Sequence, residues 1–207
     1  MEPERKGNWI QTYTGIRMYP LDPRQDEIDI EDIAHSLSMQ CRFNGHTNVF
    51  YSVAEHCCHV SDILHADLKL AGLLHDGSEA YLCDLPRPLK RCAGFADVYL
   101  DVERGLQRAI AMKFGYNWCH FPDVCIADDR LLATEALQLM APLHPEWPDC
   151  CEPVKGLTLP CWSPQEARNQ FLHRFNDLTS EGVSSPTSEI ATDQASIQSR
   201  IHRLLRS

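Results

Sequence analysis

The sequence lacks any long apolar run, because no stretch approaches the roughly 18–20 residues that a membrane-spanning helix needs. The opening segment, "MEPERKGNWIQTY", has no apolar core of the kind found in secretory signals. Basic residues are also scarce, with 19 Lys and Arg against 29 Asp and Glu and a net charge of -10. We therefore expect a cytoplasmic protein without a membrane or nucleic-acid polymer as partner, while a small phosphorylated ligand held by a few local cations stays compatible.

The 10 cysteines lack the spacing of a metal-binding or disulfide framework. No CxxC pair occurs, and the adjacent pairs Cys57-Cys58 and Cys150-Cys151 have no partner pair at zinc-finger spacing. Reduced thiols in a cytosolic protein are the simpler interpretation. Cys58 and Cys83 fall in helical patterns and are expected to be small core residues.

Apolar residues at helical spacing predict an all-α fold. The helices are expected over residues 29–43, 52–64, 68–82, 95–115, 124–140 and 163–178. Asp29, Ser52 and Ser163 are the expected N-caps of three of them. Residues 8–20, rich in β-forming residues around a glycine, predict a small hairpin.

One domain is expected over residues 1–178, followed by a tail over residues 179–207. Nine Ser or Thr residues between 179 and 199, with little apolar content, are typical of a flexible segment. The end of the tail, residues 197–206, has the pattern of a short basic amphipathic helix. A weakly docked or flexible end is the simpler interpretation of that pattern.

Two expected helices carry histidines at mirrored positions. The helices over 52–64 and 68–82 are joined by a turn near residue 66, so they should form an antiparallel hairpin. His56 then lies level with His75 and Asp76, and Glu79 lies one helical turn beyond His75. The pattern therefore brings two imidazoles and two carboxylates together.

A mixed His and carboxylate set suits Mn, Co, Fe, Ni or Zn better than calcium. Asp128 could complete four ligands, since Ile126, Leu132 and Ala133 mark what we expect to be the apolar face of its helix. Taken singly, His56 is more often a hydrogen-bonded buried histidine, and Asp128 a capping or ion-pairing residue. The combination with the mirrored spacing favours a metal site.

Three motifs, "YSVAEH", "LLHDGSEAYLCDLPRPLK" and "IADDRLLATE", resemble the HD-domain metal-dependent phosphohydrolases. The most similar branch contains the bacterial 5′-deoxynucleotidases and their prophage and phage relatives, among them the phage dATP triphosphohydrolases. The resemblance covers most of residues 8–178. It implies the metal ligands His56, His75, Asp76 and Asp128.

The resemblance also implies roles around the metal. Glu79 would be the catalytic carboxylate that handles the protons of the attacking water, and Asp84 would support that water at the entrance. Arg42 and Phe43 resemble an arginine–aromatic pair that contacts the sugar-phosphate and stacks near the base. Lys90 matches a phosphate-binding lysine.

Two positions depart from the pattern. Cys125 stands where relatives carry a lysine three residues before the last metal ligand. The loss of that cation weakens the case for a triphosphate substrate, or shifts the contact to Arg87, Arg91 or Arg130. Phe43 stands where some adenine-selective relatives have tryptophan. Stacking survives that change, but base selectivity cannot be carried over.

The resemblance implies an HD-domain helical bundle. The expected function is hydrolysis of a (deoxy)nucleotide, above all a deoxyadenosine-type dNMP or dNTP such as dATP, with release of phosphate or tripolyphosphate. The expected cofactor is a divalent transition metal, Co, Mn or Zn, with Mg or Ni as alternatives, and the expected assembly is a homo-oligomer. Two alternatives stay open: an HD-type phosphodiesterase or alarmone hydrolase, and a catalytically silent nucleotide-binding protein of the same fold.

Overall fold

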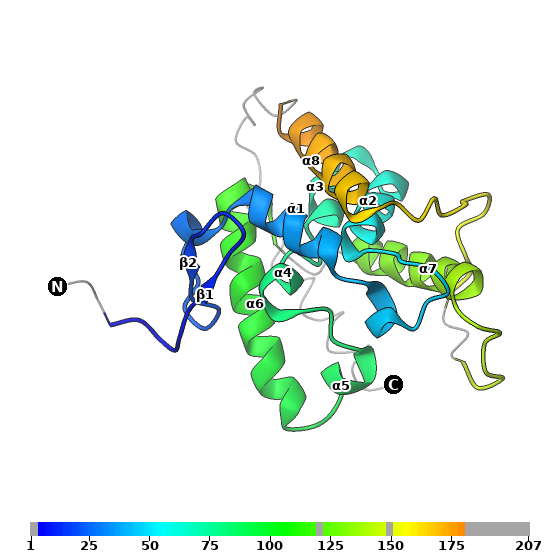
Figure 1. Ribbon diagram of the computed structural model, residues 1–207, viewed down its shortest axis with the longest axis horizontal. Helices are drawn as coiled ribbons and strands as arrows, with labels where there is room; N and C mark the ends of the chain where they lie inside the picture. Colours follow the sequence, from blue (N-terminus) through cyan, green and yellow to red (C-terminus); the bar gives the residue numbers. More distant parts are fainter. Residues whose placement is uncertain (1–3, 119–121, 148–150, 181–207) are drawn as a thin grey trace, which may run out of the picture.

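Helix α2 (Val53–Ile63) lies at the centre of the molecule, and every residue from Val53 to Ser61 is buried. The computed structural model describes residues 4–118, 122–147 and 151–180. Four helices pack against α2, as Figure 1 shows: α1 (Ile30–Met39), α3 (Lys69–Leu73), α7 (Pro122–Leu139) and α8 (Pro164–Ser180). Ser52 caps α2 by accepting a hydrogen bond from Glu55 N at 3.0 Å, which confirms the predicted cap.

The protein is mainly helical, with one small hairpin, as the sequence predicts. Strands β1 (Ile10–Gln11) and β2 (Arg17–Met18) pair antiparallel, with Ile10 opposite Met18. The hairpin is fixed to α1 because the backbone N–H and the hydroxyl of Thr14 both donate to the buried Asp32, at 2.7 and 2.8 Å. The remaining helices are α4 (Glu79–Leu82), α5 (Arg87–Lys90), α6 (Phe95–Phe114), and the 3₁₀ turns η1 (Gln25–Glu27), η2 (Arg42–Gly45) and η3 (Ala66–Leu68).

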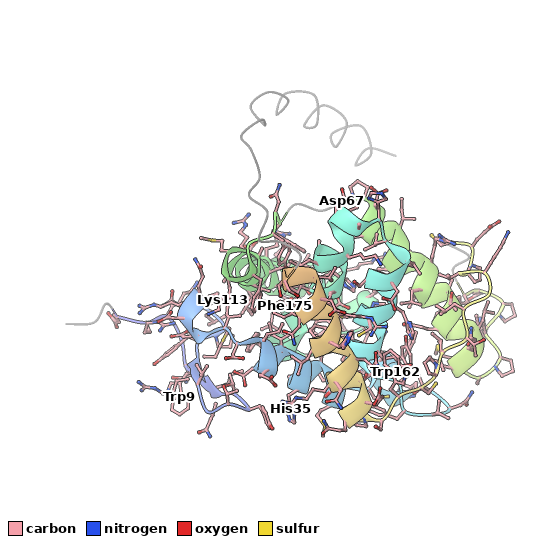
Figure 2. All side chains as sticks on the ribbon, turned by 90° about the horizontal axis from the view of Figure 1, so that it is seen from above. Trp9, His35, Asp67, Lys113, Trp162 and Phe175 are labelled. Atoms are coloured by element: carbon pink, nitrogen blue, oxygen red, sulfur yellow. The ribbon has the colours of Figure 1, made fainter. Side chains whose placement is uncertain are left out.

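Two apolar clusters form the core, and α2 contributes to both. The first joins α2 to α1, α3, α6 and α8, and it includes Leu37, Ile110 and Phe171, none of which is exposed. The second joins α2 to α7 and includes Val60 and Leu131. Figure 2 shows Asp67 at the turn after α2 and Trp9 on the opposite side of the molecule, in the N-terminal arm.

The predicted helix over residues 68–82 is wrong as a single element. The structure has α3, then turns over residues 74–78, then α4. Gln107 of α6 explains the break, because its amide donates to Leu74 O and accepts from Ser78 N. These contacts satisfy backbone groups that a continuous helix would pair internally. His75 and Asp76 therefore stand in a turn, not on a helix face.

Other boundaries also differ. The predicted helix over residues 29–43 ends at Met39, and α5, which the sequence did not predict, follows Pro86. Cys83 is exposed, with a φ of 70°, so its assignment to the core is wrong, whereas Cys58 is fully buried as expected. Helix α8 continues to Ser180, two residues into the predicted tail, and the rest of the tail lies outside the described residues.

The buried face of α7 differs from the predicted one. Val124, Ala127 and Leu131 are buried, while Ile126 is 52% exposed. Asp128 follows Ala127 and is half-buried at the edge of that face. Among the described helices, none combines the length and apolarity needed to cross a membrane.

The approach of α3 to α2 depends on Gly72. A Cβ atom at this position would lie 2.3 Å from Leu64 Cδ1 and 3.4 Å from the backbone of Ser61. The Ser61 hydroxyl donates to Lys69 O at 2.8 Å across the same contact. The two elements that carry His56 and His75 are therefore held in one register.

Candidate metal centre

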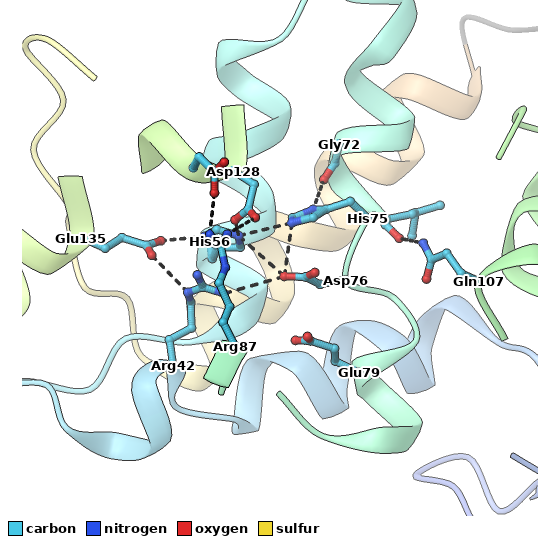
Figure 3. Close-up of polar contacts among 12 residues, drawn as sticks. Arg42, His56, Gly72, His75, Asp76, Glu79, Arg87, Gln107, Asp128 and Glu135 are labelled. Carbon is cyan, nitrogen blue, oxygen red and sulfur yellow. Dashed lines mark hydrogen bonds and ion pairs between the residues drawn. The ribbon is translucent and has the colours of Figure 1, made fainter. Parts of the chain in front are cut away.

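Helix α2 and the turn after α3 bring three side chains together (Figure 3). His56 Nε2 lies 3.3 Å from His75 Nε2 and 3.6 Å from Asp76 Oδ2. His75 Nε2 lies 3.2 Å from the same Asp76 oxygen. One ligand atom from each residue lies within 4.8 Å of the other two. The mirrored spacing in the sequence therefore predicted this group correctly, although through a turn instead of a continuous helix.

The second ring nitrogen of each histidine has an acceptor beside it. His56 Nδ1 donates to Glu135 Oε1 at 2.7 Å, and His75 Nδ1 donates to Gly72 O at 2.7 Å. A histidine that donates from Nδ1 is left with a lone pair on Nε2 when the ring is neutral. Two such lone pairs then face each other, with carboxylate oxygens around them, so the cluster favours a positive charge between its members, carried by a proton or by a metal ion.

Asp128 reaches this group from α7. Its Oδ1 lies 3.1 Å from His56 Nε2, and its Oδ2 accepts from Arg87 at 2.7 Å. Ligand atoms bound to one ion at roughly 2.0–2.2 Å lie about 2.8–3.6 Å apart at octahedral or tetrahedral angles. His56, His75 and Asp76 lie 3.2 to 3.6 Å from one another, and Asp128 lies 3.1 Å from His56. The His56, His75 and Asp76 group therefore has the spacing to hold one divalent metal ion, with Asp128 beside it.

The surrounding charges favour positive charge at this point. Burial alone would lower the pKa of His75, but the neighbouring Asp76 carboxylate outweighs it and raises the pKa to about 9. Burial would raise the pKa of Asp128, but its hydrogen bond and charge interaction with His56 hold that pKa well below the ordinary value. Both shifts have the sign expected of a cation site.

A buried ion pair between Arg42 and Glu135 contacts two members of the cluster, His56 and Asp76. Glu135 is fully buried on α7, and its Oε2 accepts from Arg42 Nε at 3.1 Å. A guanidinium nitrogen of Arg42 also lies 3.7 Å from Asp76 Oδ2. Burial would raise the pKa of Glu135, but the charges of Arg42 and His56 hold it below the ordinary value. Arg42 therefore interacts with two carboxylates in this structure, those of Glu135 and Asp76.

Glu79, at the start of α4, is 3% exposed and has only one of its oxygens paired. Its Oε1 accepts from Lys90 Nζ at 2.9 Å, and its Oε2 is buried without a hydrogen-bond partner among the described residues. Burial, followed by the charges of Asp76 and Asp84, raises the pKa of Glu79. A hydrogen bond from a water molecule or a substrate would give this buried Glu79 oxygen the partner that it lacks among the described residues.

Asp84 lies close to Glu79, and the three candidate arginines differ in their surroundings. Asp84 is half-buried close to Glu79, and its backbone N–H donates to Gln40 Oε1 at 3.1 Å. Arg87 pairs with Asp128 and with Asp129. Arg91 is exposed, and Arg130 Nε donates to Glu152 O at 3.4 Å. Of the three arginines proposed to replace the missing lysine, Arg87 is thus the one in contact with a candidate ligand.

A cavity of about 320 Å³ opens beside the cluster, between α3, α6 and α7. Its lining residues include His75, Asp76, Asp128, Lys90 and Cys125. Arg42 and Phe43 are not among the described residues that line it. Phe43 is half-buried with a φ of 54°, and the Arg42 guanidinium lies 5.6 Å from its ring centre.

Sequence reasoning missed Glu135, although a signal for it existed. Glu135 lies seven residues after Asp128, two helical turns along α7, so the two carboxylates project on the same side. Gln107 was missed as well. No local pattern identifies it, because its role depends on the packing of α6 against the turn after α3.

No protein-family model matches the chain. Over 174 residues it is 34% identical to the uncharacterized protein YfdR of Escherichia coli (strain K12), a stretch that covers 83% of this chain and 96% of YfdR. Over 119 residues it is 36% identical to an uncharacterized protein of Rhodobacter capsulatus, covering 53% of this chain and 60% of that protein.

Proposed function

The chain belongs to the family of YfdR, and we propose that this protein is a metal-dependent phosphohydrolase that acts on deoxynucleotides. One observation carries the proposal: His56 Nε2 and His75 Nε2 face each other at 3.3 Å, an Asp76 oxygen lies within 3.6 Å of both, and an Asp128 oxygen lies 3.1 Å from His56 Nε2. The resemblance to the HD-domain phosphohydrolases supplies the reaction class. Such a donor set suits Co, Mn or Zn, and it also admits Mg or Ni.

His56, His75, Asp76 and Asp128 would hold the ion. Bound there, it supplies a Lewis acid for a phosphoryl oxygen and a lower pKa for the attacking water, toward about 7. Glu135 orients the His56 ring through its 2.7 Å contact, and Gly72 O does the same for His75. These contacts keep both Nε2 atoms turned inward.

Glu79 is the proposed proton acceptor. Its Oε2 is a buried acceptor without a partner among the described residues, so a proton from the attacking water gives it its first hydrogen bond. Lys90 holds the other oxygen at 2.9 Å and also lines the cavity. It is proposed to neutralise phosphate charge, while Asp84 is proposed to support the water at the entrance.

Arg42 and Phe43 are proposed as contacts to the sugar-phosphate, as the resemblance implies. Arg42 is 7% exposed and contacts Glu135 and Asp76, so its positive charge would act on the phosphate from the protein side of the candidate metal cluster.

A cytoplasmic location and self-association belong to the proposal as well. Light scattering of the purified protein measures the assembly directly.

The test is hydrolysis of a panel of dNMPs, NMPs and dNTPs with Mn, Co, Mg or Zn, with identification of the phosphate product. Inorganic phosphate from monophosphates indicates a 5′-nucleotidase, and tripolyphosphate from dNTPs indicates a triphosphohydrolase. Hydrolysis confined to cyclic or alarmone nucleotides would replace the proposal with the phosphodiesterase alternative. Binding without turnover under every metal would leave a silent nucleotide-binding protein.

Variants of the candidate ligands distinguish loss of the site from loss of the fold. His75→Ala and Asp76→Ala should abolish hydrolysis while the helical circular dichroism signal remains. The matched control is His173→Ala, since His173 is 74% exposed on α8 and should leave activity unchanged. Metal at 100 times its Kd should stabilise the wild type by about 2.7 kcal/mol, and this gain should vanish in His75→Ala. Full activity in either site variant refutes the assignment.

A further inference from the structure

The cavity beside the candidate metal cluster has a mixed lining. The candidate ligands His75, Asp76 and Asp128 line it, together with the polar residues Ser78, Lys90, Glu103, Arg104 and Gln107. Its other lining residues are Ala71, Leu100, Trp118, Val124 and Cys125. At about 320 Å³ the cavity reaches the size range, roughly 300–1,000 Å³, of small-molecule sites. It can therefore hold more of a substrate than its phosphoryl group.

The cations that line this cavity already have carboxylate partners. Lys90 Nζ contacts Glu79 at 2.9 Å and Glu103 at 2.8 Å. Arg104 contacts Asp101 at 2.9 Å. Position 125, also in the lining, is a cysteine. Additional phosphate groups in this space would have to compete with these carboxylates, so the rest of the cavity suits an uncharged group better than a polyphosphate chain.

We infer that the lining formed by Leu100, Trp118 and Val124 is the binding subsite for the base of a nucleotide, with Trp118 as the surface on which the base stacks. The inference rests on the proposed function and specifies its substrate contact. An indole beside aliphatic side chains provides a stacking surface for any base, because every base has a π-face.

Phe43 is the competing candidate for the same role. It lies in η2, under the Arg42 guanidinium, and it is not among the described residues that line the cavity. Trp118 lines the space that begins at the ligand cluster, so a phosphoryl group at His75 and Asp76 leaves the rest of a nucleotide next to it. The geometry therefore favours Trp118 over Phe43.

The test compares dAMP with 2-deoxyribose 5-phosphate, which carries the same phosphate and sugar without a base. Trp118→Ala should lower kcat/KM for dAMP about ten-fold and leave the base-free substrate within two-fold, as loss of one stacking contact requires. Trp118→Phe should restore most of the dAMP activity. Trp9→Ala, in the exposed N-terminal arm, is the matched tryptophan control and should change neither substrate.

Each outcome is decisive. Equal loss on both substrates in Trp118→Ala, or no loss on dAMP, overturns the inference, as does a dAMP-selective loss in Phe43→Ala with none in Trp118→Ala. Failure of the proposed function gives a different result, since the wild type would then release neither phosphate from dAMP nor tripolyphosphate from dATP under any metal. If only dATP is hydrolysed, the same comparison is made between dATP and 2-deoxyribose 5-triphosphate. Metal-dependent thermal stabilisation, measured in every variant, shows that Trp118→Ala folds and retains the ligand cluster.

Discussion

The Nδ1 atom of His56 lies 2.7 Å from Oε1 of Glu135, and the other oxygen of Glu135 accepts from Arg42. Segments 93 positions apart in the chain thus meet at one fully buried carboxylate. The contact fixes the tautomer of His56 and turns Nε2 toward His75 and Asp76. Glu135 therefore orients a candidate metal ligand, His56, without being a candidate ligand itself.

Glu135→Gln should weaken metal binding about 10- to 100-fold, the range found when the partner of a metal-binding histidine is altered. The amide offers one acceptor oxygen to two donors, His56 Nδ1 and Arg42 Nε, so one of them loses its partner. Isothermal titration with Mn measures the change. Glu146→Gln, an exposed substitution, is the control, and unaltered affinity in Glu135→Gln would contradict the orienting role.

Glu79→Gln should separate metal binding from turnover. The substitution keeps the shape of the side chain but removes the proton acceptor at Oε2, so kcat should fall about 10²- to 10⁴-fold. Lys90 retains Glu103 as a partner at 2.8 Å, which limits the structural damage. Metal affinity should stay within a few-fold of wild type. A parallel loss of metal binding would instead place Glu79 among the ligands.

Sequence reasoning located the three grouped side chains because they belong to one local hairpin. His56 and His75 are 19 residues apart, and the turn between them fixes which positions lie level. The N-caps Asp29, Ser52 and Ser163 were also correct, since capping is decided within a few residues. Local interactions thus explain most of what the pattern revealed.

The errors have tertiary causes. The break between α3 and α4 depends on Gln107 of α6, which no pattern within residues 68–82 reveals. The partners of Glu55 are also distant in the chain, because its carboxylate accepts from the backbone of Cys161 and Trp162, over 100 residues away. Such partners become visible only once the helices are packed.

Glu55→Gln should lower the free energy of unfolding by about 2 kcal/mol, which corresponds to a fall in Tm of roughly 4–8 °C. Glu55 is fully buried and accepts from Cys161 N at 2.8 Å and from Trp162 N at 2.7 Å, where Cys161 has a φ of 57°. An amide cannot accept both hydrogen bonds with equal geometry. Urea unfolding measures the loss, and a Glu146→Gln protein should match the wild type.

Alkaline pH should destabilise the protein partly through Cys58. Burial raises the pKa of this thiol from 9.0 to about 12. Because the folded pKa is the higher one, the contribution of Cys58 is fully present below pH 9 and is lost as pH rises toward 12. Unfolding in urea with reductant between pH 8 and 10.5 should show a shallower decline for Cys58→Ala, by up to about 1.4 kcal/mol per pH unit.

The exposed cysteine variant Cys92→Ala is the control for this measurement and should reproduce the wild-type decline. An identical pH dependence in Cys58→Ala and wild type would show that the thiol has the same pKa in the folded and the unfolded chain, which would contradict the raised pKa of the buried thiol. The difference in slope is diagnostic, because the cavity left by Cys58→Ala lowers stability by the same amount at every pH.

The placement of the ligand cluster also has a consequence for the order in which the protein folds. His56, His75 and Asp76 belong to one short hairpin, whereas Asp128 follows only after the whole of α6. Closing a short loop costs less chain entropy than closing a long one, so the hairpin can assemble before α7 docks. A metal ion present during synthesis would first contact His56, His75 and Asp76, and Asp128 would join them when α7 docks.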